Sequence, residues 1–319
     1  MRKFLKHILI LILFTVGILI LGDICVTIGL RKSNARLFQS ITGIFSGNIN
    51  ADLIIVGNSR ARRHIDPKIV DSVLSLNSYN LGQNGTGFTI QKMIYDLYRK
   101  HNEKPKYIVH IVGNGIFEKE DGLSERIKFA PYLDDSLVRA TTMNIKGFDK
   151  LDYYLPFLRY SGFPSEIRHG VASFCGFNSA SNEEIYKGFP SPQLAWNDVI
   201  FEKFKNEFPD GTSLPISNEL VTSMDVYLKE CKREGIQIVL VHPPIYYEAQ
   251  PYFHNDALIL KLLKGLAEKN DILFLDYSAD SMSYSKENYA DHVHMNKSGA
   301  EIFTKKLSQD LKIHFSLTP

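Results

Sequence analysis

The sequence predicts an α/β protein built on an open parallel sheet of five strands, preceded by an N-terminal transmembrane helix. Three observations lead to this prediction. Residues 8–30 form a nearly unbroken apolar stretch, short β-branched runs come after it, and helix-length amphipathic segments separate those runs. Short apolar runs are typical of strands that are buried on both faces of a sheet. Strands that alternate with helices imply right-handed crossovers, and therefore a parallel sheet.

Composition narrows the class of protein. The 319 residues are 44% hydrophobic and 23% charged, which suits a globular protein with a full core. The 37 Lys and Arg against 35 Asp and Glu leave a formal charge of +2, so we expect no nucleic-acid partner. The three cysteines, Cys25, Cys175 and Cys231, exclude a multi-disulfide scaffold and a four-cysteine zinc site. Cys175 and Cys231 could pair or stay reduced.

The apolar stretch at residues 8–30 is predicted to anchor the chain in a membrane. As a helix it would span about 35 Å, enough to cross a bilayer. Asp23 lies toward one end of the stretch, where the interface is within reach. The alternative is a cleaved signal peptide with a basic start at Arg2, Lys3 and Lys6, although no convincing small-x-small cleavage site follows it.

Basic residues flank the apolar stretch on both sides, so the positive-inside rule does not decide its orientation. The orientation is therefore predicted from the signal-anchor position of the stretch at the start of the chain. We expect a single-pass protein whose main domain lies on the extracytoplasmic side, in the periplasm or outside the cell. The Asn-x-Ser/Thr sequences begin at Asn84 and Asn296, in loops assigned below to the active site. A glycan there would block the site, so a bacterial source is favoured.

Each expected strand and helix follows from this alternating pattern. Strands are expected at residues 53–56, 79–81, 107–112, 237–241 and 272–275. Helices are expected at residues 67–74, 89–101, 219–234, 256–269 and 297–311. Ligands of open parallel sheets bind beyond the carboxyl ends of the strands, so chemistry is expected in the loops that follow them.

Polar and glycine-rich loops follow the first three strands. Ser59 stands where the chain leaves the first strand for a helix, and residues 80–87 after the second strand contain three glycines. Asn114 follows the third strand between Gly113 and Gly115. Each feature also has a plain structural explanation, since serine caps helices and glycine forms turns.

The segment before the last helix makes a catalytic interpretation much stronger. Asp291 precedes His294 by three residues, so its carboxylate can accept from the imidazole Nδ1–H and leave Nε2 free to act as a base. A serine, potential oxyanion donors and an Asp-His pair, all beyond strand ends of one sheet, form a complete acyl-transfer site. The order of these residues differs from that of α/β-hydrolases, and Ala61 replaces the second glycine of their Gly-x-Ser-x-Gly motif.

The chain resembles the SGNH (GDSL-type) hydrolase superfamily over about residues 52–311. The family's first block maps onto residues 57–60, with Ser59 as nucleophile and Asn58 where an aspartate is usual. The resemblance implies a flavodoxin-like three-layer α/β/α fold. It also implies a serine-dependent enzyme, an SGNH-type ester hydrolase or acyltransferase that needs no cofactor.

The other blocks of the family map onto later loops. The glycine of the second block corresponds to Gly85, and the asparagine of the third to Asn114, with Val112 where a glycine is common. The last block corresponds to Asp291 and His294. The resemblance implies catalytic roles for Ser59, Asp291 and His294, and an oxyanion hole formed by the backbone N–H groups of Ser59 and Gly85 and the side-chain amide of Asn114.

Further residues near the strand ends are candidates for substrate binding. These are Arg60, Asn84 and His242. Arg60 begins a basic cluster with Arg62, Arg63 and His64, which is either a solvated helix face or a site for an anionic group. A metal site at Asp291, His292 and His294 is the less favoured interpretation, because alternate residues of an extended segment point to opposite sides. We therefore predict no metal.

The predicted parts are a membrane anchor at residues 1–32, a linker at 33–50 and a catalytic domain at 51–319. The catalytic domain carries an aromatic-rich insertion at about residues 116–215, whose rings either pack a small core or stack on sugar faces. A tethered domain of this kind resembles, in architecture, the accessory proteins of teichoic-acid D-alanylation and alginate acetylation. This resemblance implies that the substrate is acylated surface or exported carbohydrate, or an acyl donor. It also implies a multispanning membrane O-acyltransferase as a partner. The alternative is a non-catalytic scaffold or binding protein in a polysaccharide-modification system.

Overall fold

The computed structural model describes residues 1–177, 185–191 and 193–316. The chain forms two compact units. The first comprises Met1–Ser46 and Asp121–Asn182, and the second comprises Gly47–Glu120 and Glu183–Pro319. These boundaries differ from the predicted ones, because most of the aromatic-rich insertion belongs to the unit of the N-terminal helix and only its last part belongs to the α/β unit.

The second unit is built on a five-stranded parallel sheet in the order β2-β1-β3-β4-β5. The strands are β1 Leu53–Gly57, β2 Ser78–Asn80, β3 Tyr107–Ile111, β4 Gln237–His242 and β5 Leu273–Asp276. Each lies within one residue of its predicted limits. The predicted fold class, an α/β protein with a five-stranded parallel sheet, is confirmed.

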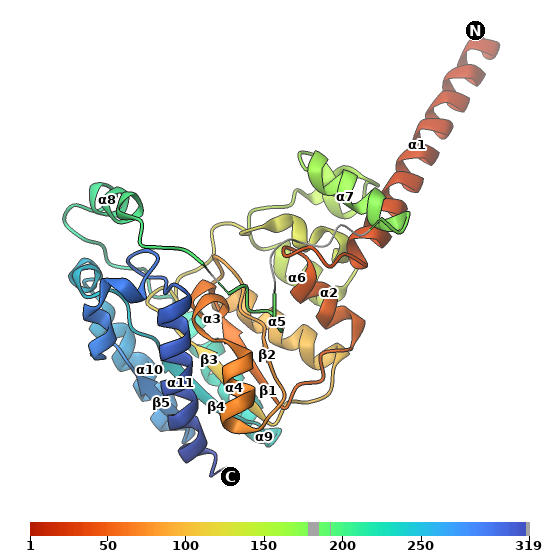
Figure 1. The fold of residues 1–319 in the computed structure, drawn as a ribbon. Helices are drawn as coiled ribbons and strands as arrows, with labels where there is room; N and C mark the ends of the chain where they lie inside the picture. Colours follow the sequence, from red (N-terminus) through yellow and green to blue (C-terminus); the bar gives the residue numbers. More distant parts are fainter. Residues whose placement is uncertain (178–184, 192, 317–319) are drawn as a thin grey trace. The chain divides into compact units, whose positions relative to one another are not determined.

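Helices cover both faces of this sheet (Figure 1). They are α3 Ser59–His64, α4 Pro67–Leu74, α5 Phe88–His101, α9 Asn218–Arg233, α10 Asp256–Asn270 and α11 Lys297–His314. Helix α8 Asp198–Glu207 lies away from the sheet. Short 3-10 turns, η5 Tyr247–Tyr252, η6 Ser281–Tyr284 and η7 Lys286–Asn288, lie in the loops. Successive strand residues point to opposite faces. Leu53 and Ile55 therefore pack with α4 and α11 in the main core, whereas His110 faces Phe88 of α5 and Tyr227 of α9.

The first unit gathers around the C-terminal end of α1 Arg2–Arg31, whose N-terminal part projects from it (Figure 1). Its other elements are α2 Gln39–Ser46, η1 Arg126–Lys128, η2 Ala130–Tyr132, α6 Ser136–Thr142, η3 Lys150–Tyr153, η4 Leu158–Tyr160 and α7 Pro164–Phe174. Helix α1 is long and apolar enough to cross a membrane, and none of its most apolar stretch is buried within the molecule. A core helix of a soluble protein would be mostly covered, so α1 is consistent with single-pass anchoring.

The last turns of α1 pack against α7 instead of remaining bare. Val26, Thr27, Gly29 and Leu30 are buried. A Cβ on Gly29 would lie 1.7 Å from the carbonyl oxygen of Gly170, so the two helices cross at contact distance. The predicted membrane segment at residues 8–30 therefore includes a part that this unit covers with protein.

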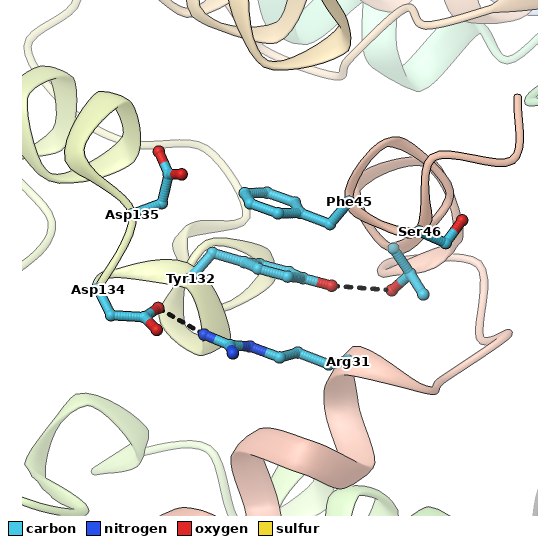
Figure 2. A pocket seen from close by; sticks show the side chains of 7 residues that line it. Arg31, Phe45, Ser46, Tyr132, Asp134 and Asp135 are labelled. Atoms are coloured by element: carbon cyan, nitrogen blue, oxygen red, sulfur yellow. Dashed lines mark hydrogen bonds and ion pairs between the residues drawn. The ribbon is translucent and has the colours of Figure 1, made fainter. Parts of the chain in front are cut away.

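A pocket of about 420 Å³ lies beside the end of α1, and the residues that line it contact one another (Figure 2). The ring of Tyr132 stacks on Phe45 with centroids 4.0 Å apart, and the guanidinium of Arg31 lies 5.2 Å from the centroid of the same ring. Arg31 also pairs with Asp134 at 2.5 Å. These contacts tie α1 to η2 and Asp134, and η2 to α2.

Gly29 and Gly17 provide a matched test of this packing. We expect Gly29→Ala to lower stability by about 1–3 kcal/mol, because an added methyl group must displace the backbone of α7. Gly17→Ala should leave stability unchanged, since nothing lies within 4 Å of a Cβ there. Thermal unfolding of the full chain in detergent micelles measures both. Equal midpoints for the two variants would contradict the close helix crossing.

Candidate active site

The turn that carries Ser59 depends on a glycine and an asparagine. β1 ends at Gly57 with φ +149°, and a Cβ there would lie 2.7 Å from the carbonyl oxygen of Ile111. The side chain of Asn58 accepts from the backbone N–H of Arg60 at 3.0 Å and so caps α3. Ser59 is therefore the first residue of the helix, and the alternative that it merely caps the helix is wrong. Asn58 does the capping that an aspartate would do in its place.

The loop after β2 fixes α3 against the sheet. The Asn80 amide donates to the carbonyl oxygens of Ala61 at 2.7 Å and Ile65 at 2.8 Å, and its oxygen accepts from Gly82 N–H at 2.9 Å. A Cβ on Gly82 would lie 2.4 Å from the backbone nitrogen of Arg62. This close approach holds the serine-bearing helix in one position.

Ser59, His294 and Asp291 form one chain of hydrogen bonds. The Ser59 hydroxyl lies 2.8 Å from His294 Nε2, and His294 Nδ1 lies 2.9 Å from Asp291 Oδ2. Since an ionised carboxylate only accepts, Nδ1 carries the proton and Nε2 accepts from the serine. The side chain of His294 is 19% exposed and that of Asp291 only 8%, so the histidine is open to solvent while the carboxylate is shielded.

Asp291 is held ionised by its donors. Burial would raise the pKa of its carboxyl group, but the hydrogen bond from His294 and those from the backbone N–H groups of Val293 and His294 outweigh burial and lower the pKa to about 2. An ionised carboxylate stabilises an adjacent imidazolium. The arrangement thus suits a histidine that takes up the proton of Ser59.

A second histidine supports the loop of His294. The N–H of Met295 donates to His64 Nε2 at 3.1 Å, and the His64 ring lies edge-on to His294 with centroids 6.3 Å apart. Burial, together with the nearby charges of His294 and Arg60, holds the pKa of His64 well below its ordinary value. His64 is therefore a neutral acceptor that positions the loop. The sequence marks it only as one member of a basic cluster.

Asn114 lies just after β3, and within the part of the chain that the structure describes the oxygen of its side-chain amide has polar contacts that the nitrogen lacks. Its Oδ1 is 3.4 Å from Arg60 Nη2 and 3.4 Å from His242 Nε2. Its Nδ2 is buried and has no partner among the residues that the structure describes. An unpaired buried donor after β3, the strand that pairs with the one leading to Ser59, suits the predicted oxyanion role.

The three candidate substrate-binding residues fall in different surroundings. Arg60 and His242 are 6% and 2% exposed and lie beneath the strand ends against Asn114. Asn84 is half-buried in the loop between β2 and α5, next to Gly85, which is exposed with φ +60°. Substrate binding by these residues, and oxyanion binding by the N–H groups of Gly85 and Ser59, stay predictions.

The solvated-face interpretation of the basic cluster is wrong for three of its four members. Arg60, Arg62 and His64 are buried, at 6%, 5% and 0% exposure. Burial lowers the pKa of Arg60 to about 10, against the opposing charges of Asp256 and Tyr289. These side chains lie inward because α3 has only six residues and is enclosed by the sheet, the loop after β2 and α11.

His292 faces away from this chain of hydrogen bonds. Its ring stacks on Phe204 at 4.4 Å and on Phe201 at 5.2 Å, both from α8. Burial lowers its pKa. The part of the insertion that belongs to the α/β unit therefore packs rings around His292.

No protein-family model matches the sequence, and no curated protein matches it. Solved structures with similar folds include one described as a lipolytic protein of the G-D-S-L family from Desulfitobacterium hafniense, with 12% identity, a TM-score of 0.41, and coverage of 81% of this chain and 97% of that one. Another, described as an acylhydrolase from Bacteroides fragilis, has 12% identity, a TM-score of 0.38, and coverage of 83% and 88%. A third, described as a platelet activating factor from Streptococcus pneumonia, has 11% identity, a TM-score of 0.44, and coverage of 88% and 94%.

The low pKa of Asp291 predicts how its contribution to stability depends on pH. A folded-state pKa of about 2, below the ordinary Asp value of about 3.9, stabilises the fold above pH 4 by about 2 kcal/mol. This contribution is lost as the pH falls from about 4 to 2. Asp291→Asn should therefore be less stable than wild type at pH 7, and the difference should shrink over that range.

Denaturant unfolding at several pH values, with the protein in micelles, measures this difference. Asp210→Asn, at an exposed carboxylate, is the control and should show a much smaller change with pH. A gap between Asp291→Asn and wild type that stays constant from pH 7 to pH 2 would count against the hydrogen bonds described for Asp291.

Proposed function

We propose that this protein is a serine-dependent acyl esterase or O-acyltransferase. The single observation that carries the proposal is the hydrogen-bonded chain from Ser59 through His294 to Asp291. In it, His294 takes the proton of Ser59 as the hydroxyl oxygen attacks an ester carbonyl, and Asp291 stabilises the imidazolium. The proton then passes from His294 to the leaving alcohol, which gives an acyl-serine.

The oxyanion of the tetrahedral intermediate needs donors that are already in place. The buried Nδ2 of Asn114 is one candidate, and the N–H groups of Ser59 and Gly85 are the others. Loss of one such donor typically costs about 2.7–4 kcal/mol of transition-state stabilisation. In the second half of the reaction water or a sugar hydroxyl attacks the acyl-serine, with His294 as the base.

We further propose that the substrate is an ester-linked acyl group, acetyl in particular, of cell-surface or exported carbohydrate. The proposal is supported by the exposed apolar half of α1, which tethers the enzyme to a membrane beside such polymers. The catalytic domain then lies on the extracytoplasmic side, and a multispanning O-acyltransferase is the proposed partner. Hydrolysis and transfer differ only in which acceptor reaches the acyl-serine.

The test is turnover of p-nitrophenyl acetate by the full chain in micelles. Ser59→Ala and His294→Ala should each lower kcat by at least about a thousandfold, because the nucleophile or its base is removed. Ser72→Ala, at an exposed serine of α4, is the matched control and should keep wild-type activity. Oligosaccharide acceptors added to the wild type distinguish the two reactions, since a transferase moves acetyl to the sugar.

A fluorophosphonate that reacts with activated serines provides an independent measurement. We expect an adduct on Ser59 that is absent in Ser59→Ala and slow in His294→Ala. A folded wild-type chain with neither turnover nor adduct would overturn the enzyme proposal and favour the scaffold alternative.

A further inference from the structure

Helix α1 changes its surroundings at Gly22 and Asp23. From Phe4 to Leu21 the large apolar side chains are exposed, with Phe14 at 67% and Leu21 at 64%. Residues 4–22 measure about 28 Å as a helix, close to the ~30 Å hydrocarbon thickness of a bilayer. The bare part of α1 is thus long enough to cross the membrane without its last turns.

Asp23 and Thr27, the polar residues that follow the exposed part of α1, are bonded to other residues of the protein. The Asp23 carboxylate accepts from the backbone N–H of Phe157 at 2.9 Å and pairs with the Arg159 guanidinium at 2.5 Å. The hydroxyls of Thr27 and Tyr160 lie 2.6 Å apart. An unpaired carboxylate in hydrocarbon is costly, and these contacts pair Asp23 directly after the exposed apolar part of α1.

The chain just before these contacts exposes a cluster of large apolar side chains. They are Leu151 at 56%, Tyr154 at 67%, Leu155 at 48% and Leu158 at 37% exposure. All four lie on η3, η4 and the residues between them, at most eight positions from the residues that hold Asp23. Exposed apolar clusters mark interaction surfaces, and tyrosine is favoured at membrane interfaces.

We propose that Leu151, Tyr154, Leu155 and Leu158 form a lipid-contact surface that enters the interfacial layer of the bilayer crossed by α1. The occupant is phospholipid, because the cluster adjoins the exposed apolar part of α1 through the Phe157 and Arg159 contacts with Asp23. The surface holds the first unit against the membrane.

Tryptophan fluorescence tests this surface, since the chain has a single tryptophan, Trp196. In a Trp196→Phe background, Tyr154→Trp and Ile302→Trp are placed in nanodiscs of phosphatidylcholine and phosphatidylglycerol. Ile302 is 50% exposed on α11 and serves as the control. Lipids brominated near the glycerol end of the acyl chain should quench the fluorescence of Tyr154→Trp at least twofold and leave that of Ile302→Trp nearly unchanged.

The opposite pattern would overturn the proposal. Aqueous iodide that quenches both tryptophans equally, with no effect of brominated lipid, means that the surface stays in water. Protection of Tyr154→Trp from iodide without quenching by brominated lipid means that protein covers it, either a second copy or another chain. In that case lipid is not the occupant.

A second inference concerns Asn114 and rests on the proposed function. The His242 ring is 2% exposed and lies between two acceptors, Asn114 Oδ1 at 3.4 Å from Nε2 and Asp276 Oδ1 at 3.5 Å from Nδ1. Burial would raise the pKa of Asp276, but hydrogen bonds from His242 and Ser278 lower it to about 2. His242 therefore faces an ionised carboxylate on one side and an amide oxygen on the other.

We infer that His242 and Arg60 are positioning residues that fix the oxygen of Asn114 and so turn its N–H2 toward the oxyanion. Arg60 Nη2 donates to the oxygen of Asn114. His242 Nε2 donates to the same oxygen when both ring nitrogens carry protons, because Nδ1 faces the carboxylate of Asp276. An amide oxygen held by both donors cannot flip away without losing both contacts. Asp276 in turn orients the His242 ring, and the parallel pairing of His242 with Asp276 brings the two together. This role differs from the substrate contact predicted for His242.

A double-mutant cycle separates the two roles. His242→Ala should lower kcat about tenfold with KM within twofold, and His242→Gln should keep most of the activity because its amide can donate to Asn114. Asn114→Ala should lower kcat at least tenfold. In the Asn114→Ala background His242→Ala should have little further effect, since the group it positions is gone.

Other outcomes would overturn the positioning role. Additive losses, or a rise of KM in His242→Ala with kcat unchanged, would assign His242 to substrate contact. Failure of the proposed function itself is distinguished by the wild type, which would then show neither turnover nor a Ser59 adduct. Circular dichroism on each variant shows that the chain is folded.

Discussion

Parallel pairing of the strands is the constraint on which the site depends. Gly57 pairs with Ile111, Ile111 with Val241, and His242 with Asp276, so the carboxyl ends of four strands meet at one edge. The loops that follow them therefore bring together residues more than 200 positions apart, Ser59 and His294 among them. If one of these strands ran in the opposite direction, its loop would leave from the other edge, and the residues of that loop would not reach the site.

Two carboxylate–histidine pairs lie at this edge and face different partners. Asp291 and His294 face the hydroxyl of Ser59, and His294 remains partly open to solvent. The His242 ring is buried and faces the amide of Asn114, while its carboxylate partner Asp276 is exposed. The same combination of a carboxylate and a histidine thus has two uses. At Ser59 it provides a proton acceptor, His294, and by our inference at Asn114 it fixes a hydrogen-bond donor, the amide N–H2. Exposure decides the difference, since only an accessible imidazole can exchange protons with a substrate.

Local features of the α/β unit could be predicted from the sequence, because its strands and helices are set by residue periodicity. Helix α4 has its predicted limits, and α10 ends one residue beyond them. The environment of α3 could not be predicted, since the burial of Arg60 and His64 depends on α11 and the loop after β2. Roles assigned through the family resemblance, those of Gly85 and Asn84 in particular, stay predictions.

The division of the chain into units could not be read from the sequence for a related reason. An apolar helix and an aromatic-rich insertion 100 residues later give no local sign that they pack together. Contacts between residues far apart in the sequence join them, such as the crossing of Gly29 with Gly170 and the pairing of Asp23 with Arg159. A continuous apolar run also conceals that its last turns are covered by protein, because a residue facing lipid and one facing a packed helix are equally apolar. Asp23 is the one residue of the run that distinguishes the lipid-facing part from the protein-covered part. A carboxylate is stable at that position only when a partner such as Arg159 neutralises it.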